Sequence, residues 1–454
     1  MPRGKPAAAA AKPVDWKTNL AAIWLSQFLS LTAFSFALPF FPLYIKEKGI
    51  VPAGDAQFWS AVFFASAPIS LMIMSPIWGV LGDKYGRKMM LVRANLGGGF
   101  ALYLMGLVDN IEALLVLRLF QGAFTGTTPA AQTLVATNTP DRNQGFAMGL
   151  LMAGVSAGNS AGLYFGGICA QYYGPVFSFK ISGVLLFLST FLVVFAVREK
   201  FVPPIRLPGA LSKSARIRRR RESVNNFLAG LPVLLIIGFG AYVQTFDPPF
   251  LSLFIDSLFR QGAEARAMTD AAITSEVYGI TGKLSLLSTV GAMIGSILAG
   301  VVMDRRMPIW TWGAVAALSG AGGLWIFASP SLLSVALGRG LYQLFLSSLA
   351  SSLIVILSRL TPSPKRGAAL GWSVTVRSVG WIFAPVSGAI CGQYLGWRES
   401  YGIIALLCLL QTPMFLYLTR RYASVFHPEE DDPPSLDSIG ESCINSPSGH
   451  GKPV

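Results

Sequence analysis

Charged residues are scarce in this 454-residue chain: they fill 13% of its positions, whereas hydrophobic residues fill 53%. Soluble domains carry about 25% charged residues, and the mean hydropathy of this chain is +0.55. The shortage of charge therefore excludes an ordinary soluble globular protein and indicates a polytopic membrane protein. Because its apolar runs are continuous rather than alternating, they favour membrane helices over a β-barrel.

Histidine and cysteine are rare as well. Both histidines, His427 and His450, lie in the C-terminal tail, so the predicted core has no histidine for a proton relay. The four cysteines lack the spacing of a metal site or of a secreted disulfide framework, and we expect no metal and no cofactor. An intramembrane enzyme is disfavoured, because no serine or cysteine in the apolar runs has a convincing catalytic partner.

The apolar runs are long enough to cross a hydrocarbon core of ~30 Å, which takes ~20 helical residues. They predict twelve membrane spans. The predicted spans are 19–44, 58–80, 89–107, 112–136, 145–170, 177–197, 228–254, 281–303, 309–328, 331–358, 367–391 and 398–419. The stretch before the first span has no separate apolar core followed by a small-residue cleavage site, so we expect no removable signal peptide.

The net charge of +14 is concentrated between these spans. Basic residues gather in alternate connections and in the central one, where Arg218 to Arg221 are consecutive. Those in the alternate connections are Lys84, Arg87, Lys88, Arg142, Lys365, Arg366, Arg420 and Arg421. Positive loops stay in the cytoplasm, so we expect both termini there. The basic residues are therefore explained by the orientation of the chain in a lipid bilayer. We expect no nucleic-acid partner.

The second half of the chain repeats the first. The matching pairs are 145–149 with 367–371, 166–174 with 388–396, 36–45 with 246–255, and Arg118 with Arg339. The first two pairs share an offset of 222 positions (from 145 to 367 and from 166 to 388). A duplicated half in a membrane protein favours a carrier, with its substrate site between the halves, over a channel.

The repeat and the spans together predict an all-α membrane protein of two six-helix pseudo-symmetric bundles. The expected parts are an N-terminal segment (1–18), a first bundle (19–197), a central loop (198–227), a second bundle (228–421) and a C-terminal tail (422–454). The tail has the acidic, proline-containing composition of a disordered segment.

The connection between spans two and three carries the run Gly79-Val-Leu-Gly-Asp83-Lys-Tyr-Gly86-Arg87-Lys88. This pattern resembles the cytoplasmic helix 2–3 loop signature of the major facilitator superfamily. Most of the chain resembles the twelve-helix drug:proton antiporters of that superfamily, of the MdtG multidrug-exporter type. The resemblance implies the superfamily fold and a secondary transporter without enzymatic activity. It also implies a monomer in the bacterial inner membrane.

In the resembled family this loop acts as a conformational lock. That implies gating roles for Gly79, Asp83, Gly86, Arg87 and Lys88. The second half repeats part of the pattern at Asp304 and Arg305, where we expect a weaker copy. A carboxylate at the end of span two can meet the positive N-terminus of span eleven, an attraction of ~0.3–1 kcal/mol.

Charges inside spans cost ~2.5–3.5 kcal/mol and are therefore functional candidates. The run Arg118-Leu-Phe-Gln121-Gly122 resembles a helix 4 signature of the family. In the proton-driven exporters this signature is linked to proton coupling. Asp247 is the one carboxylate predicted well inside a span, and burial there would favour its protonated form. The alternative for Asp247 is a solvated position at the outer mouth, where it breaks the helix with Pro248 and Pro249.

Small residues recur at every fourth position in three spans. They are Gly154, Gly158, Gly162 and Gly166 in span five, Gly291, Gly295 and Ala299 in span eight, and Gly380, Ala384, Gly388 and Gly392 in span eleven. Small residues at this spacing let helix backbones approach closely in lipid. Each stripe alone indicates static packing; the duplicated halves favour contact between the halves, with helix 5 facing helix 8 and helix 2 facing helix 11 in the resembled fold.

The predicted substrate cavity has aromatic walls and few fixed charges. Its candidate residues are Gln27, Phe34, Phe124, Tyr242, Gln244, Phe246, Tyr342, Gln343 and Arg377. Such walls suit lipophilic or amphipathic solutes, so we expect proton-coupled drug export. The alternative is uptake or facilitated transport of a small organic anion or another metabolite. Asn159 replaces the proline of the antiporter helix 5 signature, which keeps this alternative open.

Overall fold

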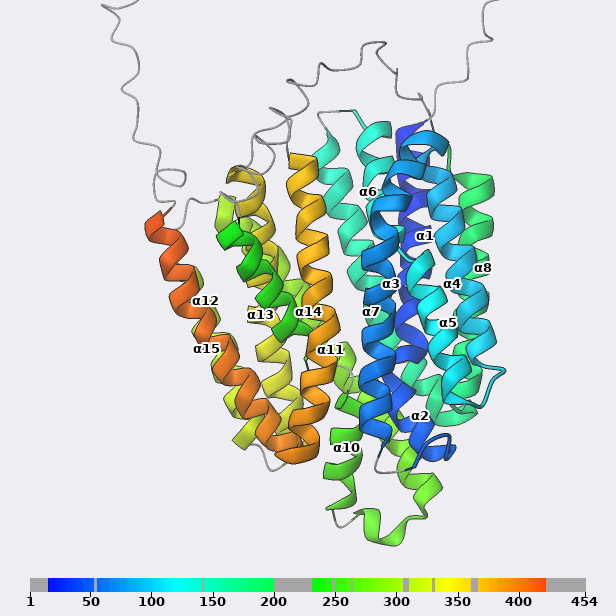
Figure 1. Cartoon of the computed structure of the whole chain (residues 1–454), viewed down its shortest axis with the longest axis vertical. Helices are drawn as coiled ribbons and strands as arrows, with labels where there is room; N and C mark the ends of the chain where they lie inside the picture. The colour runs from blue at the N-terminus through cyan, green and yellow to red at the C-terminus, as the bar shows by residue number, and fades with distance from the viewer. Residues whose placement is uncertain are drawn as a thin grey trace, which may run out of the picture.

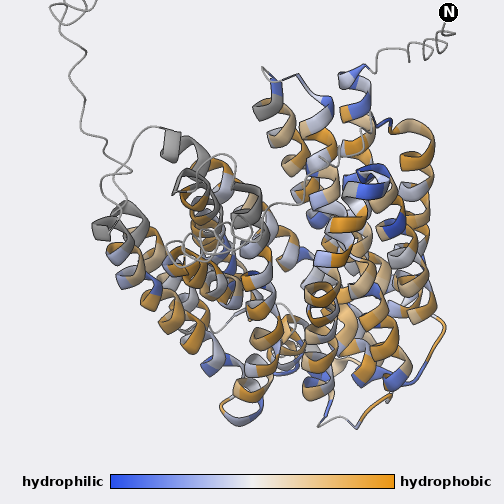
Figure 2. Ribbon diagram, turned by 45° about the horizontal axis from the view of Figure 1, so that its top comes forward, coloured by the Kyte–Doolittle hydropathy of each residue, from blue (hydrophilic) through white to orange (hydrophobic). Residues whose placement is uncertain are grey.

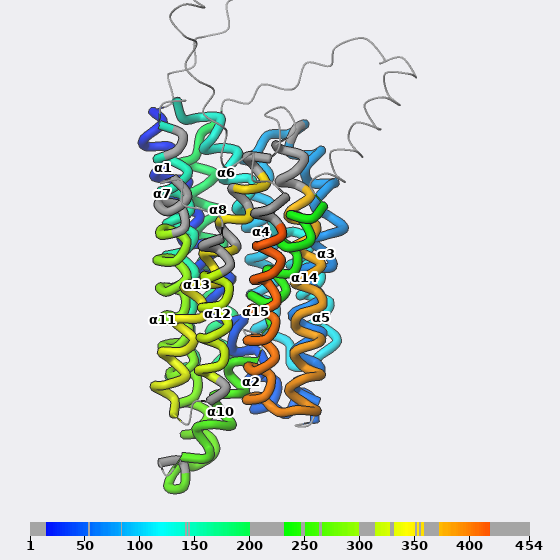
Figure 3. Tube along the Cα trace, turned by 90° about the vertical axis from the view of Figure 1, so that its left-hand side faces the viewer, coloured from blue at the N-terminus to red at the C-terminus, as the bar shows by residue number. Residues whose placement is uncertain are grey.

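The computed structural model describes residues 15–52, 55–140, 143–199, 231–246, 250–262, 264–304, 310–328, 331–360 and 366–421. Within those ranges the chain is almost entirely helical and contains no strand. Figure 1 shows the helices of the first half beside those of the second, and Figure 3 shows their axes running in roughly one direction. Hydrophobic residues predominate along them (Figure 2), as expected for helices in lipid.

The first bundle holds the helices up to residue 196. They are α1 (Trp16–Ala37), η1 (Leu38–Phe40), α2 (Phe41–Glu47), α3 (Ala56–Tyr85), α4 (Arg87–Met105), α5 (Ile111–Phe124), α6 (Thr127–Asn138), α7 (Gln144–Tyr173) and α8 (Pro175–Ala196). Asp15 caps α1, accepting hydrogen bonds from the Lys17 amide and from the Thr18 hydroxyl. The Thr18 hydrogen bond lowers the pKa of the Asp15 carboxyl.

The second bundle holds the remaining helices. They are a helix at Leu231–Thr245, α10 (Leu251–Arg260), η4 (Glu264–Ala267), α11 (Asp270–Asp304), α12 (Trp310–Ala328), α13 (Leu332–Leu360), α14 (Arg366–Tyr394) and α15 (Trp397–Arg421). Eight candidate spans in the described chain are long and apolar enough to cross a membrane, and two further apolar helices are shorter. Every predicted span coincides with a helix or a pair of helices, which confirms the all-α membrane fold.

Three predicted spans are broken rather than continuous. The first bends through η1 at Leu38-Pro39 into α2, and the seventh is interrupted between Thr245 and Leu251. The fourth, predicted as one span over 112–136, stops at Phe124 and restarts at Thr127. Gly126 lies between with a φ of 121°, in a region that side-chain-bearing residues rarely adopt. Its counterpart in the second bundle, α13, is continuous.

The glycine stripes pack helices within each bundle. A Cβ on Gly158 of α7 would meet the Phe28 carbonyl of α1, and one on Gly380 of α14 would meet the Gly238 carbonyl. The two carbonyls are equivalent in the repeat at an offset of 210 (from 28 to 238), as are the two glycines at 222. The bundles therefore repeat their packing as well as their sequence, which confirms the pseudo-symmetric fold.

The expectation that these stripes join the two halves is wrong for most of their members. Gly154, Gly158, Gly162 and Gly166 all face α1, while Gly291 and Gly295 of α11 face α13. Small-residue spacing reports a close approach but not the identity of the neighbour. Gly392, which contacts Gln57 of the other bundle, is the stripe member described at the bundle interface.

Contact between the bundles uses the helix pairs that were expected. Helix α7 packs on α11, and α3 packs on α14. The α7–α11 contact depends on Gly167 and Gly282, because a Cβ on Gly167 would lie 2.7 Å from the Gly282 Cα. The helix 5–8 and helix 2–11 pairing is therefore confirmed. The close α7–α11 contact uses glycines outside the predicted stripes, whereas Gly392 of a predicted stripe lies at the α3–α14 contact.

Candidate functional site

The described chain begins at Asp15 and stops at Arg421 on the same side of the molecule (Figure 1). We call this the terminal end and the opposite side, where α2 and α10 lie, the distal end. The predicted lock lies at the terminal end. The described hydrogen bonds between the bundles lie toward the distal end.

The turn between α3 and α4 is held by a carboxylate that the sequence analysis missed. Glu199, which follows α8, accepts hydrogen bonds from the backbone amides of Arg87 (2.7 Å) and Lys88 (2.8 Å). An anion at a helix N-terminus satisfies free amides and the helix dipole. Gly86 has a φ of 92°, and a Cβ there would come within 2.7 Å of the Glu199 carboxylate. In the sequence, the only indication of this contact was that Glu199 is an acidic residue directly after predicted span six.

Of the other residues of the predicted lock, the structure describes the side chain of Lys88 and the surroundings of Gly79. Lys88 Nζ donates to the Val194 carbonyl (2.8 Å), and Gly79 has no atom near the position of a Cβ. The side chains of Asp83 and Asp304, and all of Arg305, lie outside the described residues. The pairing of Asp83 with the N-terminus of span eleven therefore stays a prediction.

Arg118 lies buried inside the first bundle, with 7% of its surface exposed. Its Nη1 donates to Gln121 one turn along α5, and its guanidinium lies over the Phe63 ring at 4.9 Å. Its counterpart Arg339 is 4% exposed and donates to the Ser288 hydroxyl at 2.8 Å. The structure thus brings Arg118 and Gln121 together as expected; their part in proton coupling stays a prediction.

Asp247, the other predicted coupling residue, lies outside the described residues. Its nearest described neighbours in sequence are Phe246 and Phe250, both buried. The proposed role of Asp247 in coupling stays a prediction.

Arg93 of α4 is an intramembrane charge that the sequence analysis missed. Its Nη2 donates to the carbonyls of Phe124 (3.3 Å) and Thr125 (3.4 Å), which the break in the fourth span leaves free. Its guanidinium lies 3.8 Å from the ring centroid of Trp78, a cation–π contact. The run Thr125-Gly126-Thr-Thr-Pro129 was the sequence signal for the break, and the position of Arg93 within span three was the signal for the charge.

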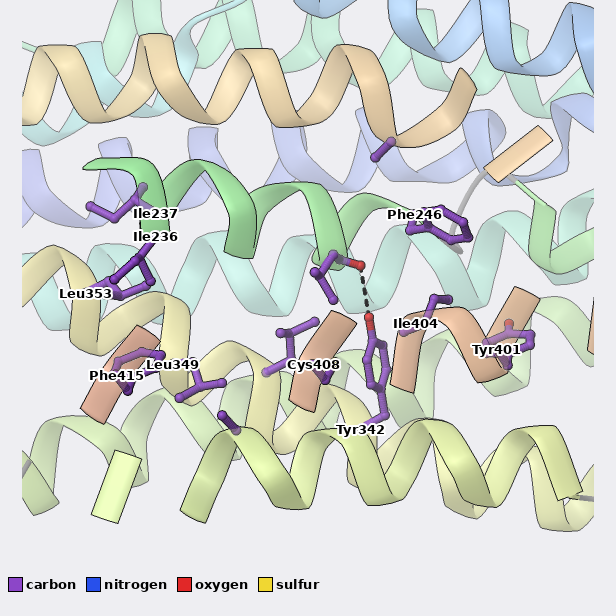
Figure 4. Close-up of a cluster of buried hydrophobic side chains, with 14 of the residues drawn as sticks. Ile236, Ile237, Phe246, Tyr342, Leu349, Leu353, Tyr401, Ile404, Cys408 and Phe415 are labelled. Atoms are coloured by element: carbon purple, nitrogen blue, oxygen red, sulfur yellow. Dashed lines mark hydrogen bonds between the residues drawn. The ribbon is translucent and has the colours of Figure 1, made fainter. Parts of the chain in front are cut away.

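Some of the predicted cavity residues are buried, and others are half-buried. Phe246 and Tyr342 lie inside the core of the second bundle (Figure 4), where the Tyr342 hydroxyl donates to the Val243 carbonyl at 3.0 Å. Gln27 and Gln343 are also buried. Half-buried side chains are Phe34, Phe124, Tyr242, Gln244 and Arg377. Tyr342 is therefore a core residue in this conformation. Phe34 and Phe124 pack against Gly98 and Gly97 of α4, so their place in a cavity wall stays a prediction.

Several polar groups between the helices have no described partner. Among them are the buried N–H donors Gln27 Nε2, Arg93 Nε and Nη1, Arg118 Nε and Arg377 Nε. A buried donor without an acceptor costs about 1–3 kcal/mol. Within the described chain, no group of three histidine, cysteine or carboxylate side chains could hold a metal ion.

The bundles are fastened at the distal end. Every hydrogen bond described between them lies there: Lys46 with Asp256, Tyr278 with Glu47, Gln57 with the Ala389 carbonyl, and Gln171 with both Glu276 and Ser275. A shared apolar cluster backs them, including Phe40, Leu43, Ile255 and Val277. Toward the terminal end the helices around α15 lean away from the first bundle (Figure 1).

Comparison with known proteins agrees with this architecture. Multidrug resistance protein MdtG of Escherichia coli (strain K12 / DH10B) is 29% identical over 400 residues, covering 87% of this chain and 92% of its own. A bacterial homologue of the human lysosomal transporter Spinster has the same fold, with a TM-score of 0.70 and 15% identity over 91% of this chain and 99% of its own. The nucleoside transporter NupG also gives a TM-score of 0.70, at 14% identity over 88% and 99% of the two chains.

The sequence profile of the Major Facilitator Superfamily matches residues 23–264 and 249–447, which together span most of the chain. With the duplicated bundles and the paired helices α7–α11 and α3–α14, this match accounts for both halves. The chain is a transport protein rather than an enzyme, and it belongs to the major facilitator superfamily.

Proposed function

We propose that this transporter exports lipophilic or amphipathic compounds in exchange for protons, by alternating access between its two bundles. The observation that carries the proposal is the similarity to a multidrug resistance protein over nearly the whole of both chains. The aromatic residues among the predicted cavity residues agree with it, since aromatic walls suit solutes with large apolar surfaces. Binding to such a wall depends on area more than on shape.

The proposed setting is the bacterial inner membrane, with the terminal end in the cytoplasm and a monomer as the working unit. The basic connections of the sequence support this orientation. In that orientation the structure is closed outward, because its described contacts between the bundles gather at the distal end. A drug would enter from the terminal end in this state.

The proposed proton coupling uses a buried arginine and a carboxylate. Arg118 and Gln121 form a buried pair without a carboxylate among the described residues, so the proton itself must bind elsewhere. Asp247 is the proposed carrier, next to the break in the seventh span. Arg118 would then act through its positive charge, which favours the ionised carboxylate when the two approach.

A second candidate function is transport of a small organic anion. The unpartnered N–H donors favour it, because a carboxylate would supply acceptors for Gln27 Nε2, Arg93 Nη1 and Arg377 Nε. An amphipathic anion would satisfy these donors and the aromatic wall together. A cation would satisfy the wall alone.

Transport into inverted membrane vesicles tests both candidates. A proton gradient is imposed across the vesicle membrane. Either a lipophilic cationic dye or a fluorescent aromatic carboxylate is then added outside. Gradient-driven accumulation of the cation supports drug:proton exchange, and accumulation of the carboxylate alone supports the anion carrier. No gradient-dependent accumulation of either probe, or of a wider solute panel, contradicts proton-coupled export. Asp247→Asn with unchanged coupling contradicts the proposed role of that carboxyl.

A further inference from the structure

An ion pair with a buried carboxylate joins the two bundles at the distal end. Lys46 of α2 places its Nζ 2.5 Å from Oδ2 of Asp256 in α10. The Asp256 side chain is 3% exposed, whereas that of Lys46 is 34% exposed. Within the described chain Asp256 is the one fully buried carboxylate. A charge in that position is costly unless it is paired, and the carboxylate has two cationic partners, Lys46 from the first bundle and Arg260 from its own helix.

The two partners occupy equivalent positions in the repeat. The stretch 36–45 corresponds to 246–255, and the same offset of 210 relates Lys46 to Asp256. The rotation that superposes one bundle on the other carries each position to its counterpart across the pseudo-two-fold axis. Two counterparts can therefore touch only where both lie close to that axis. The ion pair thus marks the distal mouth of the space between the bundles.

Asp256 keeps a second cation when the bundles part. Arg260, one turn along the same helix, donates from Nε to Asp256 Oδ1 at 2.9 Å and from Nη1 to Asp270 Oδ1 at 2.7 Å. Because all three belong to the second bundle, they move together. Separation would break only the Lys46 contact, and the half-exposed Lys46 ammonium would return to water. The arrangement favours closure without making opening prohibitive.

The neighbouring contacts place the pair within a continuous seal. Tyr278 of α11 donates to Glu47, the residue after Lys46, at 2.8 Å. The Tyr278 ring packs edge-on against Phe40, with 5.8 Å between centroids. Ile255, the residue before Asp256, is fully buried in the same apolar cluster. Breaking the ion pair would therefore loosen the layer that closes the distal end.

We propose that Lys46 and Asp256 form the distal clasp of this transporter: a charge pair on the pseudo-two-fold axis that closes the distal mouth and separates each time the mouth opens. The inference rests on alternating access as proposed above, but it does not depend on which solute is carried or on proton coupling. It assigns gating roles to two residues outside the terminal-end lock.

Charge reversal tests the clasp on the full-length protein in lipid nanodiscs. Spin labels are placed at L107C and L395C, exposed positions at the distal ends of the two bundles, in a background without native cysteines. Pulsed electron paramagnetic resonance then measures the distance between the labels. Lys46→Asp and Asp256→Lys should each raise the population with longer distances by about tenfold or more. The double variant K46D/D256K should return the distribution to that of the parent.

The matched control is Lys48→Asp, which reverses an exposed charge two residues away and should leave the distances unchanged. The proposal is overturned if the single reversals leave the distribution as it was, or if the double variant stays as open as the singles. If a reversal fails to fold, Lys46→Gln and Asp256→Asn are measured in the same way. Unchanged distances in those neutral variants likewise overturn the clasp. Because the readout is distance, a failure of drug transport does not affect this test.

Discussion

Two glycines of the same sequence signature have different physical roles. Gly86 adopts a left-handed backbone conformation and lies against the Glu199 carboxylate, whereas Gly79 lies in a helix with open space around it. The signature itself gives both glycines the same weight. The structure indicates that Gly86 is required by its backbone and by the Glu199 contact, and that Gly79 is not required for packing in this conformation.

Substitution by alanine should separate the two glycines. Gly86→Ala should lower the free energy of unfolding by about 1–2 kcal/mol or more, because its positive φ strains an L-residue and its Cβ displaces Glu199. Gly79→Ala should be neutral or slightly stabilising, since alanine is the better helix former. Thermal unfolding of both purified variants in detergent checks this. Equal melting temperatures for the two variants would contradict the account of the turn.

Broken spans are the feature of the elements that matters most for function. The first and fourth spans were predicted to be continuous, and a break at Pro248 and Pro249 in the seventh was one of two alternatives for Asp247. The break of the fourth span at Gly126 exposes carbonyls in the membrane, and Arg93 of the neighbouring helix satisfies them. A broken helix is tolerated at membrane depth only where such partners exist.

Replacing Arg93 should show how far it supports the break. Arg93→Leu leaves the Phe124 and Thr125 carbonyls without their donor and removes the stack on Trp78, so we expect a loss of about 1–3 kcal/mol. Arg93→Lys keeps one cation and should recover part of that loss. Tryptophan fluorescence during thermal unfolding reports both. A leucine variant as stable as the parent would show that the carbonyls are satisfied in another way.

The sequence predicted the elements of this fold better than the contacts between them. The repeat at 145–149 and 367–371 predicted two equivalent bundles, and apolar runs located the helices. The partners of the glycine stripes could not be predicted, because spacing along one helix does not name the helix that faces it. Glu199 and Asp256 were missed for the same reason: each acts through a residue more than a hundred positions away.

At the scale of the whole molecule, the structure joins two equivalent bundles firmly at one end. Helix pairs α7–α11 and α3–α14 form the surface between them, and close backbone contact at Gly167 and Gly282 brings that surface together. The hydrogen bonds described across it gather at the distal end. The alternating access proposed above requires that end to open in every cycle, so transport should depend on the bundles moving apart there.

A reversible cross-link between Gln57 and Ala389 tests this requirement most directly. These residues of α3 and α14 are in hydrogen-bond contact across the bundle interface, and Q57C with A389C in a background without native cysteines allows a short thiol bridge to fix the distal end. Transport of whichever probe the vesicle assay identifies should fall to background when the bridge forms and recover when it is reduced. Undiminished transport with the bridge intact would contradict alternating access by these two bundles.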